Sequence, residues 1–170
     1  MRLFNTLKTW LTLQCCLCVA LLISSFALEY LFHLVPCVLC QLQRCVVCIL
    51  CVTSLMMRLT YLKRRLFLII SAVMGVWILI GLGLAIRHIY LQYQPLGEIA
   101  THCLPSLRVM LTWLPWSTVW AQLMQGDGVC HTVTFKFLGL TLPMWLASAY
   151  AVLMILWGYL LAHKDHREAH

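Results

Sequence analysis

Two cysteines, Cys37 and Cys40, stand three residues apart directly after a proline, at the start of an apolar run. A Cys-X-X-Cys at the N-terminus of a helix is suited to thiol–disulfide chemistry, because the partial positive charge of the terminus stabilises a thiolate. Arg44 follows one helical turn after Cys40, so it would place a full positive charge on the same face. The spacing therefore predicts a redox-active dithiol at the start of a helix.

The composition places this dithiol in a membrane protein. Of the 170 residues, 63% are hydrophobic and 10% are charged, and the mean hydropathy is +0.91. Five acidic residues could not solvate a globular surface of this size. The net charge of +7 does not indicate nucleic-acid binding, because the basic residues cluster at the ends of apolar runs. We therefore expect a polytopic membrane protein that binds no nucleic acid.

Four apolar runs are long enough to cross a bilayer core of about 30 Å. They predict spans at about 10–34, 37–57, 66–86 and 143–162, within a single membrane domain over residues 1–170. The first run is too long for the apolar core of a signal peptide and no small-X-small site closes it, so we expect an uncleaved span. Gly75, Gly81 and Gly83 in the third run favour close contact between helices.

The distribution of basic residues predicts the orientation of the spans. Eight of the twelve lysines and arginines lie at the two termini and between the second and third spans: Arg2, Lys8, Arg58, Lys63, Arg64, Arg65, Lys164 and Arg167. By the positive-inside rule, both termini are then cytoplasmic. Cys37 and Cys40 would face the oxidising periplasmic side of a two-membrane bacterium.

The segment 87–142 would form a long second periplasmic loop. Within it, Trp113, Trp116 and Trp120 fall on one helical face. A fifth span is disfavoured because Pro115 interrupts the run and Arg108 lies inside it. We expect an interfacial helix or helix pair instead. The fold class is therefore all-α transmembrane, a four-helix bundle with a short interfacial helix in the second periplasmic loop.

Two further cysteines, Cys103 and Cys130, lie in this loop and on the same predicted side as Cys37 and Cys40. Two cysteine pairs in one oxidising compartment suggest two exchangeable disulfides. The pair on the loop could carry electrons from a soluble partner to the pair at the bilayer by thiol–disulfide exchange. A purely structural Cys103–Cys130 staple is the alternative, and the spacing does not choose between the two.

Several motifs, in order along the chain, make this sequence resemble the disulfide-bond formation protein B (DsbB) family. The dithiol with Arg44 lies within four spans, and residues 126–130 (GDGVC) are similar to the family's Gly-Asp-Cys. Residues 137–145 (FLGLTLPMW) are similar to its Phe-Leu-Gly-Leu-X-Met-Pro-X-Trp signature. Ala27-Leu28-Glu29, His88 and residues 92–95 also match. The resemblance covers nearly the whole chain.

The resemblance implies a quinone-dependent protein-disulfide oxidoreductase of the bacterial inner membrane. Such proteins reoxidise a DsbA-like, thioredoxin-fold periplasmic dithiol oxidase and pass two electrons to ubiquinone or menaquinone of the membrane pool. Cys103 would form the mixed disulfide with that partner. Cys130 would be its loop partner and would exchange with Cys37. We expect a monomer.

The resemblance also implies a quinone-binding set. Cys40 would face the quinone and form a thiolate charge-transfer complex or transient adduct with it. Arg44 would stabilise the reduced quinone and the Cys40 thiolate, because a fixed guanidinium in low dielectric suits developing negative charge. His88 would lie near the quinone ring. Gln43 departs from the pattern, since many family members carry glutamate there, and Glu29 is expected mainly to pack between helices.

Other classes of function remain as alternatives. A zinc site would use Cys37, Cys40, Cys45 and Cys48, although a continuous helix would not fold back to bring all four together. A b-type haem could use His33 and His88, each near the outer end of a span. A vitamin-K-epoxide-reductase-like oxidase is a closer alternative. That family has its quinone-side dithiol late in the sequence of its helical core, whereas here the dithiol opens the second span. The cysteines inside the apolar runs are expected to pack as small hydrophobic residues: Cys15, Cys16, Cys18, Cys45, Cys48 and Cys51.

Overall fold

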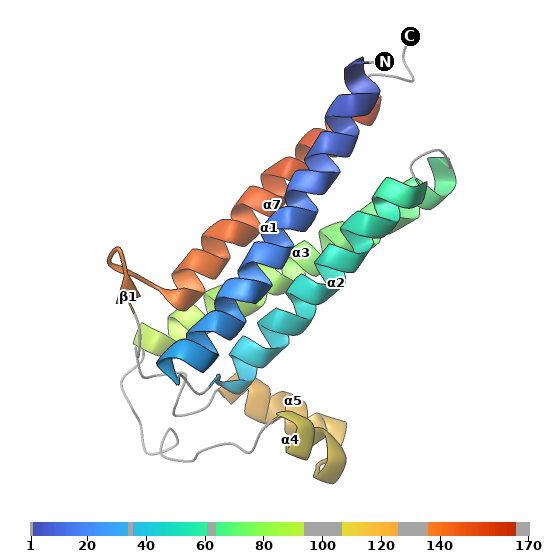
Figure 1. The fold of residues 1–170 in the computed structure, drawn as a ribbon. Helices are drawn as coiled ribbons and strands as arrows, with labels where there is room; N and C mark the ends of the chain where they lie inside the picture. Colours follow the sequence, from blue (N-terminus) through green and yellow to red (C-terminus); the bar gives the residue numbers. More distant parts are fainter. Residues whose placement is uncertain (1, 34–35, 61–63, 94–106, 126–135, 166–170) are drawn as a thin grey trace.

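Four long helices lie side by side in the computed structural model (Figure 1), which describes residues 2–33, 36–60, 64–93, 107–125 and 136–165. They are α1 (Arg2–Phe32), α2 (Val38–Thr60), α3 (Arg64–Tyr93) and α7 (Leu142–Asp165). Helix α1 packs on α2, α2 on α3 and α3 on α7, and a smaller contact between α7 and α1 closes the bundle. The predicted all-α four-helix class is confirmed.

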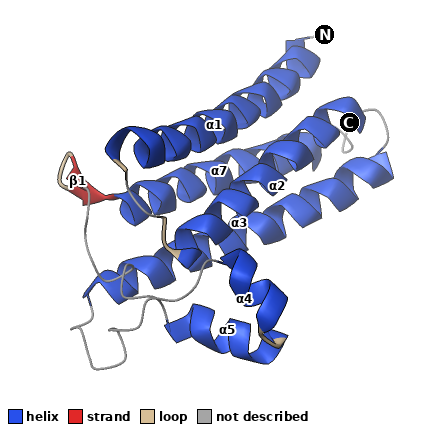
Figure 2. Cartoon of the chain, turned by 60° about the horizontal axis from the view of Figure 1, so that its bottom comes forward, coloured by secondary structure: helices blue, strands red, loops and turns tan. Residues whose placement is uncertain are grey.

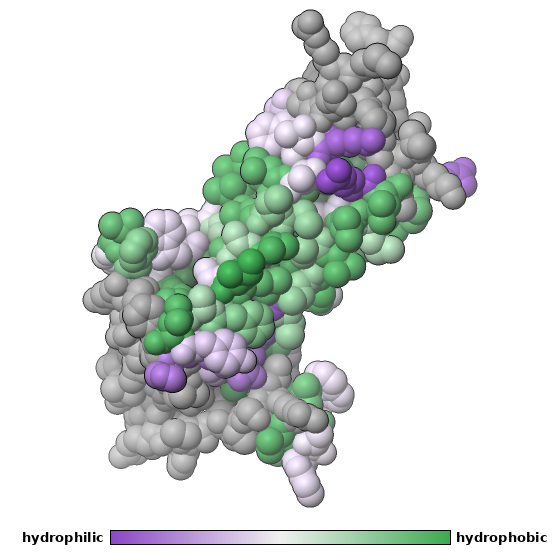
Figure 3. All heavy atoms as spheres, in the orientation of Figure 1, coloured by the Kyte–Doolittle hydropathy of each residue, from purple (hydrophilic) through white to green (hydrophobic). Residues whose placement is uncertain are grey.

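Each of the four helices carries a stretch long and apolar enough to cross a membrane: Lys8–Leu31, Val38–Leu59, Arg65–Tyr93 and Leu142–Tyr159. Large apolar side chains on these stretches point outward, and Ile23, Ile69 and Ile155 are each more than 60% exposed. Figure 3 shows this hydrophobic surface along the helices, with hydrophilic residues toward either end. In water such exposure would be costly, so this is the surface of a multi-pass membrane protein.

Close contact between α3 and α7 depends on two glycines. A Cβ atom on Gly81 would lie 2.4 Å from the ring of Tyr150, and one on Gly75 would lie 2.5 Å from the ring of Trp157. Tyr150 is fully buried in the core of the bundle. The expectation of close packing is therefore confirmed at Gly75 and Gly81, whereas a Cβ on Gly83 would meet nothing within 4 Å.

Helix α3 continues to Tyr93, beyond Ile86, where the predicted membrane span ends. The physical reason is that residues 84–93 contain no glycine or proline to stop the helix. Hydropathy falls where the polar residues begin, but the helical hydrogen bonds of the backbone continue through them. The extension matters because it makes His88 and Gln92 part of a rigid helix rather than of a loop.

A helix pair follows at the end of the bundle where α2 begins (Figure 1): α4 (Leu107–Trp113) and α5 (Trp116–Gln125). Pro115 separates them, since it cannot continue a helix. Met110, Val119 and Leu123 pack against Val38 in the first turn of α2. Trp113, Trp116 and Trp120 point outward and are between 59% and 84% exposed. The expected short helices outside the bundle are confirmed, as a pair.

A short hairpin precedes α7, formed by β1 (Lys136–Phe137) and β2 (Leu140–Thr141). Leu138 and Gly139 form its turn, both with positive φ, as a two-residue hairpin of this twist requires. The indole of Trp145 donates to the carbonyl of Phe137 at 3.0 Å. Figure 2 shows the hairpin beside the first turn of α7. Residues 137–145 therefore form one unit, a turn held against the start of the last helix.

Candidate active site

Cys37 caps the N-terminus of α2. Its sulfur accepts the backbone N–H of Cys40 at 3.3 Å, and its carbonyl accepts the N–H of Gln41 at 3.1 Å. This is the arrangement of an N-cap residue, with a thiol where a serine or aspartate usually stands. Because the unpaired N–H groups of a helix start carry partial positive charge, a negative charge on the Cys37 sulfur is stabilised at this position.

The two sulfurs of the dithiol face one another. Cys37 Sγ donates to Cys40 Sγ at 3.1 Å, so the two sulfurs are already in contact. Cys37 is only 4% exposed, whereas Cys40 is half-buried. The two cysteines are therefore not equivalent, and Cys40 is the one more open to a molecule outside the bundle.

His88 of α3 completes the group. Its Nε2 lies 3.8 Å from Cys37 Sγ, and the two sulfurs and a ring nitrogen all lie within 4.8 Å of one another. Apolar side chains close around them, with Leu39 and Leu91 buried beside Cys37. An imidazole in this position can accept or donate a proton at the Cys37 sulfur, according to its tautomer and charge.

The side chain of Arg44, on α2, is held by residues of α1. Its Nε donates to Ser25 Oγ at 2.6 Å, one terminal nitrogen donates to the Ser25 carbonyl at 3.1 Å, and the other forms an ion pair with Glu29. Its guanidinium carbon also lies 4.7 Å from the centre of the Phe26 ring. The side chain of Arg44 is 17% exposed and that of Glu29 is 30% exposed. The guanidinium is therefore fixed in place by three residues of α1.

Ser25 and Glu29 are site residues that the sequence reasoning missed as partners of Arg44. Glu29 was expected mainly to pack between helices, and its carboxylate joins α1 to α2 through an ion pair with Arg44, which follows Cys40 by one helical turn. A usable signal existed, because an ionisable residue inside an apolar span usually pairs with another one at the same depth. Glu29 is near the end of α1 and Arg44 near the start of α2, and these two ends are joined by a short connection.

The loop cysteines fall outside the part of the chain that is described. Cys103 and Cys130 belong to residues 94–106 and 126–135. Their pairing and their exchange with Cys37 therefore stay predictions from the sequence. Within the described residues, the dithiol, His88 and the α4–α5 pair lie at the same end of the bundle, because Val38 next to Cys37 packs on both short helices.

The four-cysteine zinc set does not assemble. Cys45 and Cys48 are exposed on the outer face of α2, on the same continuous helix as Cys40. Among the described residues, the one group of three possible ligands is Cys37, Cys40 and His88. For the haem alternative, His33 is exposed just after α1, whereas His88 is 4% exposed and lies against Cys37.

Two contacts tie the last helix to the site. Thr141 Oγ1 donates to Gln92 Oε1 on α3 at 2.9 Å, one turn beyond His88. The Tyr150 hydroxyl donates to the carbonyl of Gln43 on α2 at 3.4 Å. The start of α7, with its hairpin, therefore braces both helices that carry the dithiol and the histidine.

Comparison with known proteins gives one consistent family. The model of the family described as Disulfide bond formation protein DsbB matches residues 7–160. The chain is 32% identical over 151 residues to the disulfide bond formation protein B of Marinobacter nauticus, covering 86% of this chain and 87% of the relative. Its identity to that of Hahella chejuensis is 31% over 159 residues, with coverages of 90% and 96%. For Acinetobacter baumannii it is 35% over 138 residues, with 78% of each chain covered.

Proposed function

The chain belongs to the DsbB family of disulfide bond formation proteins, and we propose that it reoxidises the dithiol of a DsbA-like periplasmic protein and passes the electrons to a membrane quinone. Family membership makes it a membrane protein-disulfide oxidoreductase. The single observation that supports the finer proposal is the Cys37–Cys40 contact of 3.1 Å at the start of α2, with His88 beside it.

The steps at the protein's own sulfurs are disulfide exchanges. The partner's thiolate attacks Cys103 of a Cys103–Cys130 disulfide, the mixed disulfide forms, and Cys130 leaves as a thiolate. Cys130 then attacks Cys37 of the Cys37–Cys40 disulfide, and Cys40 leaves as a thiolate. The partner's second thiolate releases Cys103, which attacks Cys130 and so frees Cys37. Each exchange breaks one S–S bond and forms another, so no electrons are lost. The end result is an oxidised partner and a reduced Cys37–Cys40 pair. The helix terminus stabilises negative charge on Cys37, and His88 supplies or removes its proton.

The residues beside Cys40 suit a quinone. When bound, a quinone takes up two electrons and two protons, and its two carbonyl oxygens accept hydrogen bonds. Gln43 is 3% exposed, and its side-chain nitrogen has no hydrogen-bond partner among the described residues. A buried donor without a partner is costly unless something accepts from it. Gln43 and the guanidinium of Arg44 are therefore proposed to hold the carbonyl oxygens, with Cys40 as the sulfur that faces the ring.

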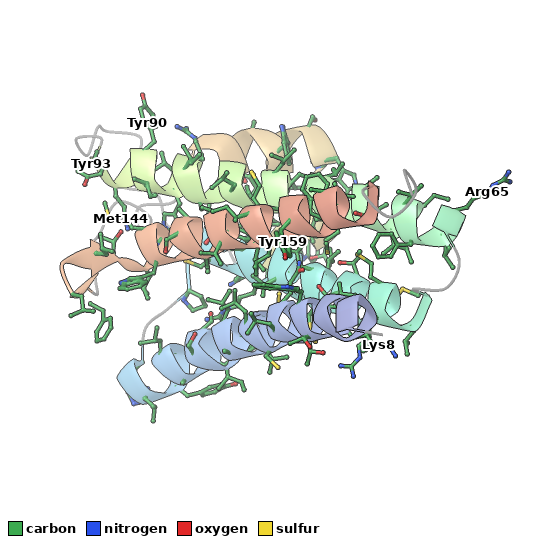
Figure 4. All side chains as sticks on the ribbon, turned by 90° about the horizontal axis from the view of Figure 1, so that it is seen from above. Lys8, Arg65, Tyr90, Tyr93, Met144 and Tyr159 are labelled. Carbon is green, nitrogen blue, oxygen red and sulfur yellow. The ribbon has the colours of Figure 1, made fainter. Side chains whose placement is uncertain are left out.

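The orientation is proposed from the charge at the two ends. Figure 4 has Lys8 and Arg65 at one end of the bundle and Tyr90, Tyr93 and Met144 at the other. The basic end holds both chain termini in Figure 1. By the positive-inside rule this end faces the cytoplasm of the bacterial inner membrane, so the dithiol lies toward the periplasm.

The test is quinone reduction by purified protein in detergent, driven by a reduced thioredoxin-fold periplasmic oxidase. The native chain should turn over, and Cys40→Ser and Cys103→Ser should each abolish turnover. Cys45→Ser and Cys48→Ser are the matched controls, since these exposed thiols of α2 lie outside the site, and they should keep native rates. The proposal would be refuted if the Cys40→Ser variant still turned over. It would also be refuted if the native chain showed no turnover with any quinone.

A metal-binding role is the second candidate, and the grouping of Cys37, Cys40 and His88 favours it. Two thiolates and an imidazole within 4.8 Å of one another are a suitable ligand set for zinc. The metal content of protein purified without chelators separates the two. A stoichiometric metal that is lost in Cys37→Ser would support the metal role, and metal-free protein that turns over would exclude it.

A further inference from the structure

A second pair of sulfurs meets far from the active site. Cys15 on α1 and Cys51 on α2 lie with their Sγ atoms 3.5 Å apart. The sequence suggested only that these cysteines pack as small hydrophobic residues, because they lie inside apolar runs. The proposed relay uses neither of them.

The pair belongs to a regular antiparallel contact between α1 and α2. Toward the end with the termini, Arg58 donates to Thr12 Oγ1 at 2.8 Å, and toward the dithiol, Arg44 donates to Ser25 Oγ at 2.6 Å. The Cys15–Cys51 contact falls between these two. Along α2, Cys51 is eleven residues from Cys40, which corresponds to about 16 Å of helix. The two sulfur pairs are therefore separate sites on one helix.

The surroundings distinguish Cys15 and Cys51 from the other cysteines of these spans. Cys18 is completely buried in the core of the bundle, and Cys16 and Cys48 are exposed on its outside. Cys15 and Cys51 are half-buried, so each residue is in contact with its partner and is also partly open to the outside of the bundle. They form no group of three metal ligands among the described residues, since that arrangement is restricted to Cys37, Cys40 and His88. The chemistry left to them is that of a dithiol.

We propose that Cys15 and Cys51 are a second redox site, which a membrane-dissolved quinone oxidises to a disulfide between α1 and α2. Both S–H bonds break, one S–S bond forms, and the two electrons and two protons convert the quinone to a quinol. The sulfurs must approach from 3.5 Å to about 2.05 Å for the bond to form.

The disulfide would link the two helices that hold the guanidinium of the active site. Ser25 and Glu29 on α1 bind Arg44 on α2, so the position of one helix against the other determines that contact. A covalent bond between Cys15 and Cys51, farther from the dithiol in the same interface, would keep the two helices in this register. When the quinone pool is oxidised, this disulfide would therefore form and make the α1–α2 pair more rigid.

The experiment counts free thiols by intact mass spectrometry. Replacing Cys37, Cys40, Cys103 and Cys130 by serine removes four of the ten cysteines and leaves six. This protein, in nanodiscs, is treated with a short-chain ubiquinone analogue, denatured and alkylated with N-ethylmaleimide. Six alkylations are expected without quinone and four with it. The alkylation count needs no partner protein and no turnover. This proposal can therefore be refuted while the proposed function holds, and the proposed function can be refuted while this proposal holds.

Single replacements identify the pair. Adding Cys15→Ser or Cys51→Ser should leave five alkylations with or without quinone. Adding Cys16→Ser or Cys48→Ser, the matched neighbours, should give five without quinone and three with it. A quinone-treated protein that still takes six alkylations overturns the proposal, as does a loss of two alkylations that persists in Cys15→Ser. Diamide serves as a second oxidant, and a disulfide formed by diamide alone also overturns the assignment of quinone as the oxidant.

Discussion

At the scale of single residues, the site is asymmetric. Cys37 is buried, accepts a backbone hydrogen bond and lies beside His88, whereas Cys40 is half-buried and lacks the cap position. A buried, capped sulfur is suited to exchange with another cysteine of the same chain, and a more open one to a small molecule from the bilayer. This difference is a property of position, since the two side chains are chemically identical.

Arg44→Ala should weaken the use of quinone more than the use of the partner protein. The variant loses a guanidinium that can donate charge-assisted hydrogen bonds, each about 1.5–3 kcal/mol, so the KM for quinone should rise about 10- to 100-fold. The KM for the reduced periplasmic partner should stay within about twofold. Steady-state kinetics with each substrate varied in turn measures both.

Arg58→Ala is the control for that experiment. Arg58 also lies between α1 and α2, where it contacts Thr12 at the opposite end of the helices. Its loss should leave both KM values near those of the native chain. An unchanged KM for quinone in Arg44→Ala would contradict the role proposed for this arginine.

At the scale of elements, α1 and α2 are joined by polar contacts inside an apolar interface. The strongest is the ion pair of Arg44 with Glu29, supported by Ser25. Polar contacts of this kind fix the register of two spans, because the surrounding lipid offers no alternative partner to the buried groups. Arg44 therefore also helps to hold α1 and α2 together.

Glu29→Ala should lower the stability of the bundle by about 1–2 kcal/mol, because it leaves the guanidinium of Arg44 without its counter-charge. The double variant Glu29→Ala/Arg44→Ala should be less destabilised than the sum of the two single variants, by about 0.5–2 kcal/mol. Reversible unfolding in mixed detergent micelles gives the four free energies of the cycle. Strictly additive values would show that the two side chains do not interact.

The α3–α7 contact gives a matched pair of glycine replacements. In Gly81→Ala the new methyl group would lie 2.4 Å from the buried Tyr150 ring, so we expect a loss of about 1–3 kcal/mol. In Gly83→Ala the methyl group meets nothing within 4 Å, and alanine favours a helix over glycine by about 1 kcal/mol. The melting temperature in detergent should fall in the first and stay or rise in the second. Equal melting temperatures would contradict the close approach.

At the scale of the whole molecule, the two ends of the bundle differ in chemistry. One end has basic side chains and both termini, and the other has the dithiol, the helix pair α4–α5 and the hairpin before α7 (Figure 1). An enzyme that takes electrons from a protein in water and delivers them to a molecule in lipid needs its reactive sulfurs at such a boundary. The helix extension to Tyr93 and the outward tryptophans of α4 and α5 belong to this end.

The orientation can be tested with two introduced cysteines in a chain whose native cysteines are replaced by serine. Tyr93 and Arg65 are both exposed and lie at opposite ends of α3 (Figure 4). In intact cells, a membrane-impermeant maleimide should label Tyr93→Cys and should label Arg65→Cys only after the membrane is permeabilised. The reverse pattern would place the dithiol in the cytoplasm and would contradict the proposed pathway.

The sequence by itself determined the properties that depend on neighbouring residues. Apolar runs predicted the four helices, because a span is a matter of length and hydropathy. The Cys-X-X-Cys after Pro36 predicted a dithiol at a helix start, since three residues bring both sulfurs onto one turn. The tryptophans around Pro115 predicted helices outside the bundle. Hydropathy does not predict where a helix ends, and α3 continues past the predicted span to Tyr93 because no glycine or proline stops it.

Only the tertiary structure decided which helices face one another. Helical periodicity tells which residues share a face of one helix, but it carries no information about what lies opposite. The contact of His88 with Cys37 spans 51 positions, that of Glu29 with Arg44 spans 15, and that of Cys15 with Cys51 spans 36. Each depends on packing and register between separate helices. For that reason Arg44 was expected to act on the Cys40 thiolate and the reduced quinone, and its partners on α1 became visible only in the folded bundle.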